Sequence, residues 1–190
     1  MANARRELIL KAAVHLFNEN GYHATSMHDV AEAASIKKPS VYHHFSSKEA
    51  ILVAILEGSM DRLILKLKVI AESDSEPLTK LRDAIQAHAL AIAENPESAA
   101  VFLREDRGLG DQYLTQYITK RDQFEEFFRQ IVREGISAGM FRDLDVVITV
   151  KAILGMTNWL TRWYRQDGRL NAAEIANLFS NLLIVGLQRP

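Results

Sequence analysis

Apolar side chains recur every three or four residues along almost the whole chain, and the strict alternation typical of strands is nearly absent. Only four prolines and nine glycines interrupt the pattern. It therefore predicts an all-α protein of about nine helices. The first helix runs to residue 20, and the others span about 26–34, 39–45, 47–72, 78–94, 96–107, 111–138, 143–166 and 171–187.

The helix ends in the N-terminal part carry clear local signals. Asn20 and Gly21 favour the left-handed conformation that follows a helix. Thr25 or Ser26 offers a hydroxyl to cap the second helix, and Pro39 fits the first turn of the third. We therefore expect a small N-terminal domain (residues 1–48) of short helices. A larger helical domain (49–190) follows, with a polar connector, ESDSEP, near residue 73.

Charge and composition exclude several classes of protein. The 23 basic and 24 acidic residues nearly cancel, so no global field directs the chain to nucleic acid or membrane. The absence of cysteine excludes disulfides and Cys-ligated zinc. We see neither a signal peptide nor an apolar run near the ~20 residues of a membrane span, so we expect a cytoplasmic protein with no membrane partner. Arg5 and Arg6 fit equally a solvated terminus and a contact to DNA.

The stretch SIKKPSVYHHFSSKEAIL begins at Ser35 and crowds lysines, a tyrosine and two histidines onto one short segment. Two short helices joined by a tight turn match the helix-turn-helix plan, which places its second helix in the DNA major groove. Val41 and Phe45 lie four residues apart and are expected to face the core. Ser40 and His43 then point away from it.

Each polar residue of this segment has a plausible role on a DNA duplex. Lys37 and Lys38 can neutralise phosphates, and Tyr42 can donate to a phosphate oxygen. Ser40 and His43 can approach base edges. The candidate DNA-binding residues are Thr25, Ser26, Lys37, Lys38, Pro39, Ser40, Tyr42, His43, His44 and Lys48, the last of which would reach the DNA backbone.

Residues 9–52 resemble the DNA-binding domain of TetR-type transcriptional regulators. The shared pattern is an Ala-Ala-x-x-Leu-Phe helix, Gly-Tyr, a Thr-Ser pair, a Val-Ala helix and Val-Tyr-x-x-Phe-x-x-Lys-Glu. Its members here are Ala12, Ala13, Leu16, Phe17, Gly21, Tyr22, Thr25, Ser26, Val30, Ala31, Val41, Tyr42, Phe45, Lys48 and Glu49.

The resemblance implies a homodimeric repressor that binds a palindromic double-stranded DNA operator. Residues 1–48 would read the DNA, and residues 49–190 would bind a ligand and dimerise. Family members usually have glycine where this chain has Ser35, and often where it has Pro39. Ser35 would then have to adopt a positive φ.

Three other interpretations fit the residues less well. His23, His28, His43 and His44 suggest a metal site, but adjacent histidines on a helix diverge by about 100° and no HExxH motif is present. We expect no enzyme and no cofactor, because no nucleophile elbow and no phosphate-binding glycine loop is found. A helical adaptor that binds only protein would not need the Lys-Tyr-His cluster.

The last two helices are expected to form the dimer interface. This is their role in TetR-type proteins, and their apolar residues leave little room for a polar face. They are Val146, Val147, Val150, Ile153 and Leu154 on one helix, and Ile175, Leu178, Phe179, Leu182, Leu183, Val185 and Leu187 on the other.

Large side chains on the middle helices are the candidate ligand-binding residues. They are Phe102, Tyr113, Tyr117, Phe124, Phe128, Met156, Trp159 and Trp163. Each fits an ordinary core position as well.

The stretch NWLTRWYRQDGRLNAAEIANLF (158–179) is similar to the C-terminal segment of TetR-type regulators of fatty acid and steroid degradation. Their inducer is an acyl-coenzyme A thioester. The resemblance implies a small hydrophobic effector, with an apolar tunnel for the acyl chain. The phosphates would meet arginines such as Arg104, Arg107, Arg162 or Arg165, although each also fits a surface salt bridge. A different effector class, such as drugs or other aromatic efflux substrates, is the alternative.

Overall fold

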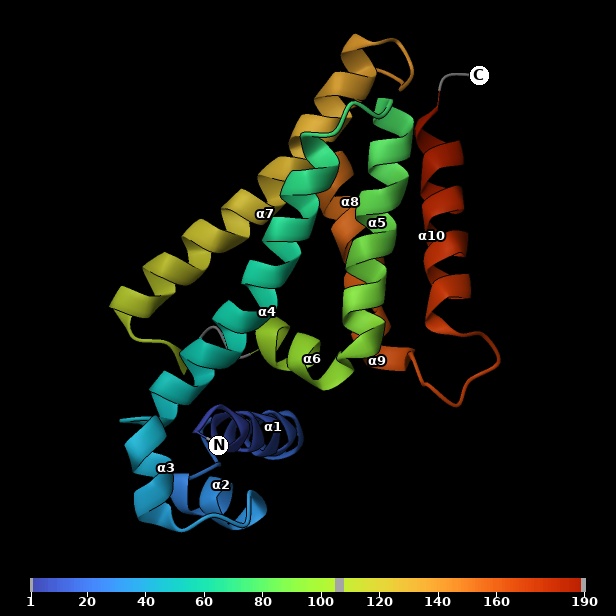
Figure 1. Ribbon diagram of the computed structural model, residues 1–190. Helices are drawn as coiled ribbons and strands as arrows, with labels where there is room; N and C mark the ends of the chain where they lie inside the picture. Colours follow the sequence, from blue (N-terminus) through green and yellow to red (C-terminus); the bar gives the residue numbers. More distant parts are fainter. Residues whose placement is uncertain (1, 105–107, 189–190) are drawn as a thin grey trace. The chain divides into compact units, whose positions relative to one another are not determined.

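The structure is a computed structural model that describes residues 2–104 and 108–188. These residues confirm the all-α prediction, since their only β-type pairing is an isolated bridge between Phe141 and Gln188 (Figure 1). The helices are α1 (Ala2–Asn20), α2 (Met27–Ala33), α3 (Lys38–His44), α4 (Lys48–Ala71), α5 (Pro77–Glu94), α6 (Pro96–Arg104), α7 (Asp111–Ser137), α8 (Val146–Asn158), α9 (Leu160–Trp163) and α10 (Ala172–Leu187).

Most helix ends follow the sequence signals, with one clear exception. The helix predicted over 143–166 is two helices, α8 and the single-turn α9, which meet at Trp159. Helix α8 begins late because Asp145 is its N-cap, and the Asp145 Oδ1 accepts the N–H of Ile148 at 2.9 Å. The predicted end of the sixth helix at residue 107 lies outside the described residues.

The contacts of the chain form two compact units, which are described separately. Unit 1 comprises Met1–Ser59 and Glu97–Ile118, and unit 2 comprises Met60–Pro96 and Thr119–Pro190. Helices α4 and α7 each contribute residues to both units. The contacts therefore group α6 with the N-terminal helices, whereas the boundary at residue 48 stays a prediction about functional domains.

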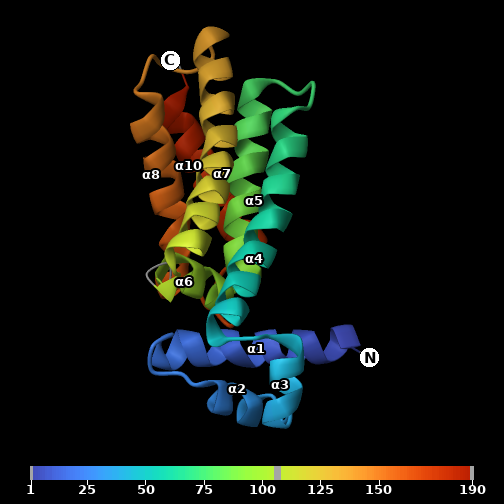
Figure 2. The ribbon, with the colours of Figure 1, turned by 90° about the vertical axis from the view of Figure 1, so that its left-hand side faces the viewer.

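The core of unit 1 is built by the apolar faces of its short helices. Helix α2 packs against both α1 and α3 (Figure 2). Ile9 and Phe17 of α1 are fully or almost fully buried, as is Val41 of α3. Gly108 is part of this unit, and a methyl group in its place would overlap the ring of Tyr22.

In unit 2, α5 packs against α8, α9 and α10, and runs beside α10 in Figure 1. The nearly buried Lys80 of α5 fastens the end of α4 in this unit. Its Nζ donates to the Ala71 carbonyl at 2.8 Å and to the Glu134 carboxylate at 3.0 Å. Hydrogen bonds from Gln130 and from Lys80 lower the pKa of Glu134. Helices α4, α5 and α7 are thus tied at one point.

The end of α7 depends on a glycine. The buried ring of Phe141 lies directly on Gly135, and a methyl group there would overlap it. We expect Gly135→Ala to lower the free energy of unfolding by about 1–3 kcal/mol, because a packed core resists added volume. Thermal and urea unfolding measure the change.

Gly58→Ala is the matched control for Gly135→Ala. Gly58 also lies inside a helix, α4, but a methyl group there would meet nothing within 4 Å. This substitution should stabilise the protein by about 0.5–1 kcal/mol, since alanine loses less backbone entropy on folding. Equal effects of the two substitutions would contradict the packing of Phe141 on Gly135.

Candidate DNA-binding surface and sensing helices

Helix α2 begins with a complete capping box. The Ser26 Oγ accepts the Asp29 N–H at 3.2 Å, and the Asp29 carboxylate accepts the Ser26 N–H at 2.8 Å. The hydrogen bond from the Ser26 backbone is the main reason that the pKa of Asp29 is lowered. Ser26 is exposed, so its side chain is accessible while it also fixes the start of α2.

The turn between α2 and α3 contains the predicted strained residue. Ser35 has a φ of 54°, in the left-handed region, which confirms the expectation from the sequence. Its N–H donates to the Glu32 carbonyl, and the Ile36 N–H donates to the Ala31 carbonyl, both at 2.9 Å. This turn ends at Lys37, the N-cap residue of α3.

Helix α3 has the two faces that the sequence predicts. Val41 is fully buried and Phe45 is 5% exposed. Tyr42 is 47% exposed, and His43 is exposed beside it.

The remaining predicted residues of the segment are accessible to different degrees. Lys37, Lys38 and Pro39 are exposed, whereas Ser40 and His44 are half-buried. One face of α3 is thus polar and accessible to solvent, and the opposite face is apolar and buried.

Arg6, whose role the sequence did not decide, lies close to the end of α3. Its guanidinium carbon is 5.2 Å from the centroid of the Phe45 ring, within the range of a cation–π contact. Arg6 therefore packs on the folded part of unit 1.

Thr25 does not fit the predicted role of a DNA contact. It is 3% exposed, and its hydroxyl lies within hydrogen-bonding distance of the carbonyls of Gly21 (3.0 Å) and Leu16 (3.4 Å). The side chain therefore closes the turn between α1 and α2, and its small exposed fraction leaves little of it for a DNA contact.

Lys48 is half-buried, and its ammonium makes hydrogen bonds within the protein, in contrast to the predicted phosphate contact. Its Nζ donates to the carbonyls of Tyr22 and Thr25, each at 2.6 Å, and lies 4.3 Å from the centroid of the Tyr22 ring. The ammonium therefore holds the α1–α2 turn against the start of α4.

We expect Lys48→Met to destabilise the protein by about 2 kcal/mol, because hydrogen bonds to a charged group are lost. Thermal unfolding measures this. The control is Lys38→Met, which removes an exposed lysine and should weaken DNA binding with little effect on stability. The opposite pattern, a stable Lys48→Met protein with weak DNA binding, would restore Lys48 to the DNA-binding set.

Helix α6 and the first turns of α7 are fastened within unit 1 by polar contacts that the sequence did not predict. The Glu49 Oε1 accepts the Gly110 N–H at 2.6 Å, and Arg104 donates to the Asn18 side chain at 3.0 Å. His15 lies 3.2 Å from the Glu97 carboxylate. That hydrogen bond is the main cause of the raised pKa of His15.

The predicted ligand-binding residues fall into both units. In unit 1, Phe102, Tyr113 and Tyr117 are half-buried against the core. The Tyr117 hydroxyl donates to the Phe102 carbonyl at 3.3 Å.

The other ligand candidates belong to unit 2. Phe124 and Phe128 are buried there, with ring centroids 5.5 Å apart. Met156 is half-buried, whereas Trp159 and Trp163 are 63% and 45% exposed. Only Phe124 and Phe128 of these five are deep core residues.

A buried polar pair in unit 2 was not predicted. His88 of α5 is 6% exposed, and its Nδ1 lies 2.9 Å from the hydroxyl of the fully buried Thr157 of α8. Burial lowers the pKa of His88 to about 4, so the ring is neutral at neutral pH. A lone histidine on an apolar helix gives no sequence signal for such a pair.

The arginines proposed for phosphate binding have varied surroundings. Arg104 bonds to Asn18, and Arg165 pairs with Asp167 at 3.0 Å. Arg162 is exposed, and Arg107 lies outside the described residues.

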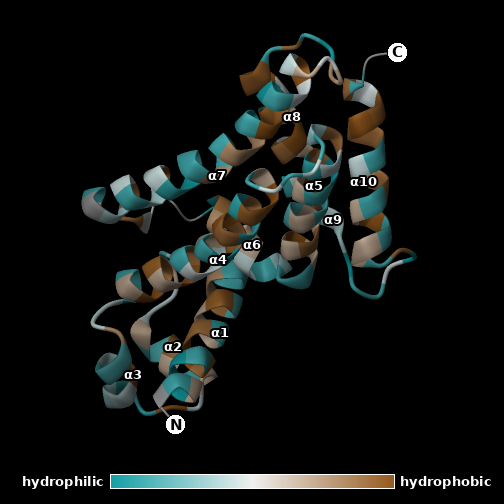
Figure 3. Cartoon of the chain, turned by 45° about the horizontal axis from the view of Figure 1, so that its top comes forward, coloured by the Kyte–Doolittle hydropathy of each residue, from teal (hydrophilic) through white to brown (hydrophobic). Residues whose placement is uncertain are grey.

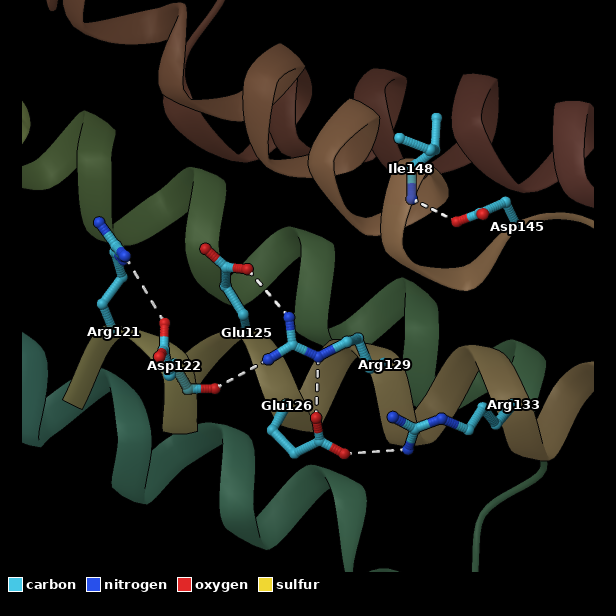
Figure 4. Close-up of polar contacts among 8 residues, drawn as sticks. All are labelled: Arg121, Asp122, Glu125, Glu126, Arg129, Arg133, Asp145 and Ile148. Atoms are coloured by element: carbon cyan, nitrogen blue, oxygen red, sulfur yellow. Dashed lines mark hydrogen bonds and ion pairs between the residues drawn. The ribbon is translucent and has the colours of Figure 1, made fainter. Parts of the chain in front are cut away.

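Helix α7 carries its own charge network (Figure 4). Arg129 pairs with Glu125 at 3.0 Å and with Glu126 at 2.8 Å, and Arg133 also reaches Glu126 at 2.9 Å. Hydrogen bonds from Arg133 and Arg129 lower the pKa of Glu126. These arginines are neutralised within the helix, which gives them a structural role.

Helices α8 and α10 expose large apolar side chains, and much of both is hydrophobic in Figure 3. The exposed residues are Val147 (46%) and Ile148 (63%) on α8, and Leu178 (55%), Leu182 (65%) and Val185 (73%) on α10. The opposite side of α10, including Ile175 and Ile184, is buried. One apolar face of α10 is therefore left uncovered within the single chain.

The described residues were searched for metal-binding groups and for membrane-spanning helices. In the ranges 2–104 and 108–188, no group of three or more His, Asp or Glu side chains could hold a metal ion. Within the same ranges, no helix combines the length and hydrophobicity that crossing a membrane requires.

Comparison with known proteins gives matches along most of the chain. A family model described as bacterial regulatory proteins, tetR family, matches residues 9–55, and one described as tetracyclin repressor-like, C-terminal domain, matches residues 74–187. The chain is 32% identical over 189 residues to the HTH-type transcriptional repressor KstR2 of Mycobacterium tuberculosis, covering 98% of this chain and 94% of the relative.

Solved structures agree with these matches. The ketosteroid transcriptional regulator KstR2 of Mycobacterium tuberculosis has a TM-score of 0.91 at 30% identity, covering 98% of this chain and 96% of that one. The regulator PfmR of Thermus thermophilus has a TM-score of 0.86 at 38% identity, covering 95% and 99%. AibR, solved in complex with isovaleryl coenzyme A and operator DNA, has a TM-score of 0.84 at 25% identity, covering 95% and 98%.

Proposed function

The chain belongs to the TetR family of DNA-binding transcriptional regulators, and from this premise we propose that its homodimer binds a palindromic operator through α3 and releases it when a hydrophobic effector binds. The observation that carries the proposal is the open polar face of α3, with Tyr42 and His43 exposed above a buried Val41. The protein would act as a repressor in the cytoplasm, where its operator lies.

The proposed DNA contacts divide into two kinds. Lys37, Lys38 and Tyr42 would contact phosphates and so fix the position of α3 in the major groove. Ser40 and His43 would contact base edges and so select the sequence. Ser26, Pro39 and His44 border this face, whereas the burial of Thr25 and the internal bonds of Lys48 argue against direct contacts.

Two substitutions separate these kinds of contact. Tyr42→Phe removes only a hydroxyl and should weaken binding to operator and random DNA by a similar factor. His43→Ala should lower operator affinity by roughly 5- to 100-fold while it changes binding to random DNA little. Fluorescence anisotropy at fixed salt measures both. Equal losses on the two DNAs for His43→Ala would contradict base contact by His43.

Dimerisation is proposed to occur through α8 and α10. The support is the uncovered apolar face of these helices, since isolated chains rarely leave such a surface in water. A two-fold dimer would place two copies of α3 at a fixed separation, which a palindromic operator matches.

The effector is proposed to be a coenzyme A thioester with a hydrophobic acyl group. The support is the similarity to AibR, whose structure contains isovaleryl coenzyme A, and to KstR2, a ketosteroid regulator. Phe124, Phe128, Met156, Trp159 and Trp163 are the candidate contacts in unit 2.

The candidates in unit 1 are Phe102, Tyr113 and Tyr117. Helices α4 and α7 continue from one unit into the other, so an effector that binds one arrangement of α4 better than another would change the separation of the two α3 helices. Operator release would follow from this shift in population.

The proposal is tested by displacement of labelled operator DNA with a panel of coenzyme A thioesters that differ in acyl length and branching. Concentration-dependent release by a subset of the panel, and no release by free coenzyme A, is the expected result. Release by no thioester would return the effector to other hydrophobic classes while leaving DNA binding in place.

A further inference from the structure

The side chain of Arg121, on α7 in unit 2, has a buried donor without a partner. Among the residues that the structure describes, its Nε is the one buried side-chain nitrogen or oxygen that lacks a hydrogen bond. The side chain as a whole is 42% exposed, and its Nη2 lies 3.6 Å from the Asp122 Oδ1, too far for a hydrogen bond. The guanidinium therefore combines an enclosed, unpaired donor with a part that meets solvent.

The spacing of charges on α7 explains why Arg121 has no better partner. Glu125 lies one turn after Arg121 and one turn before Arg129, so both arginines are in register with its carboxylate. The carboxylate accepts from Arg129 at 3.0 Å. This is the favoured order on a helix, with the acid four residues before the base. Asp122, the adjacent residue, points about 100° away around the helix and does not replace it.

The other arginines in the same part of α7 do not share this deficit. Arg129 and Arg133 both donate to the Glu126 carboxylate, at 2.8 and 2.9 Å. Figure 4 shows Arg121 apart from this network, with Asp122 as its contact among the residues drawn. Because a guanidinium keeps its charge at neutral pH, loss of a proton does not relieve the unpaired donor.

An unpaired buried donor is unfavourable and unusual. It has lost its water without gaining a bond, and each such group in a native protein calls for an explanation, such as a bound ion. The guanidinium presents Nε and one Nη as a planar pair of donors that match two oxygens of a carboxylate or a phosphate. Arg121 thus has the chemistry to bind an oxyanion, and no carboxylate in the described part of the chain bonds to this pair.

Arg121 also lies beside an apolar surface. Phe124 and Phe128 follow it by three and seven residues, so all three lie on one side of α7. Both phenylalanines are buried, with ring centroids 5.5 Å apart. A cation next to aromatic side chains suits a ligand that carries negative charge on an apolar body.

We propose that Arg121 binds a phosphate or carboxylate group of the effector through Nε and Nη2. Because Nε is enclosed in the ligand-free chain, the side chain turns outward on binding and gives up only the long contact to Asp122. This assignment rests on the proposed function, since it names the charged group of the same effector. The oxyanion is either a phosphate of coenzyme A or a carboxylate on the hydrophobic part, and the two sources are separated by experiment.

NMR of the full-length protein with nitrogen-labelled arginine tests the contact directly. The probes are adenosine 3′,5′-bisphosphate, which has phosphates but no acyl group, octanoate, which has a carboxylate on an apolar chain, and octanol, the uncharged analogue of octanoate. A shift of the Arg121 Nε resonance with the bisphosphate assigns the phosphate, and a shift with octanoate assigns the carboxylate. The proposal is overturned if neither anion shifts this resonance more than octanol does.

Operator release provides the second test, with Arg133→Gln as the matched control. Arg133 lies on the same helix and is 51% exposed, but its guanidinium is already bonded to Glu126. Arg121→Gln should raise the thioester concentration for half release about 10- to 100-fold, the value of hydrogen bonds to a charged group, whereas Arg133→Gln should change it little. Arg121→Lys keeps the charge but not the paired donors, so its effect should be intermediate. Release of the wild type and of Arg121→Gln at equal concentrations would overturn the proposal.

Thermal unfolding separates effector binding from a structural role of Arg121. The ligand-free Arg121→Gln protein should be as stable as the wild type, because Nε is unpaired and the Asp122 contact is long. The stabilisation that a releasing thioester gives should be smaller in this variant, because the thioester binds it less tightly. A less stable ligand-free variant with an unchanged response to the thioester would assign a structural role and overturn the proposal.

Failure of this assignment can be told apart from failure of the proposed function. If no thioester releases operator DNA but one of the anions shifts the Arg121 Nε resonance, the effector class is wrong and the Arg121 contact stands. If thioesters release DNA equally from the wild type and Arg121→Gln, and neither anion shifts this resonance, the effector class stands and the Arg121 contact is wrong.

Discussion

Leu182→Glu is expected to dissociate the dimer and to lower operator affinity by roughly 30- to 1000-fold, as for the loss of an interface hot spot. Leu178, Leu182 and Val185 lie on one side of α10 and are more than half exposed. Their spacing of four and three residues forms a single stripe along the helix. In a two-fold dimer each substitution occurs twice, so two buried carboxylates would oppose association.

Leu65→Glu provides a matched control for this prediction. Leu65 lies on α4 and is 65% exposed, the same exposed fraction as Leu182, but it is not part of the proposed interface. It should leave the dimer and operator affinity unchanged. Analytical ultracentrifugation and fluorescence anisotropy measure the two properties. A dimeric Leu182→Glu protein with normal operator binding would place the interface elsewhere.

The second large effect is a loss of stability in mild acid caused by His88. The folded state holds the pKa of His88 near 4 by burial, whereas the unfolded chain keeps the ordinary value of 6.5. Between these pH values the unfolded state binds a proton that the folded state does not, so unfolding becomes more favourable as pH falls. The contribution is fully present above pH 6.5, and about 3 kcal/mol is lost by pH 4.

Urea unfolding of the wild type and of His88→Leu at several pH values isolates this effect. The variant has no titrating group at position 88, so its stability should fall less between pH 6.5 and pH 4. Asp29, Glu126 and Glu134 have lowered pKa values, so their contributions to protein stability are also lost in acid. This loss is the same in the wild type and in the variant. Parallel curves for the two proteins would contradict a buried, neutral His88.

The sequence was sufficient for features that depend on local backbone chemistry. The end of α1 at Gly21, which has a φ of 83°, follows from residue type. The positive φ of Ser35 follows from the resemblance to TetR-type proteins, which usually have glycine at this position. The burial of Val41 and Phe45 follows from their spacing of four on a helix. The break at Trp159 was missed because the residues around it keep the helical pattern.

The sequence could not predict side-chain roles that depend on partners far away along the chain. A lysine next to a DNA-binding helix suggests a phosphate contact, but the carbonyls that hold Lys48 come from residues 22–25, more than 20 positions earlier. The hydrogen bonds of the Thr25 hydroxyl to the carbonyls of Leu16 and Gly21 were not predicted either, since they form only in the folded turn. The pairing of His88 with Thr157 spans 69 residues and leaves no periodic trace.

Reading of DNA by α3 is tested most directly by comparing two duplexes of equal length at one salt concentration. One is taken from the region upstream of the coding gene, and the other has a random sequence of the same composition. The purified protein is expected to bind the upstream DNA roughly 1000-fold more tightly than the random DNA, the lower range for specific DNA-binding proteins. Equal affinity for the two duplexes, measured by fluorescence anisotropy, would contradict sequence-specific DNA binding by α3.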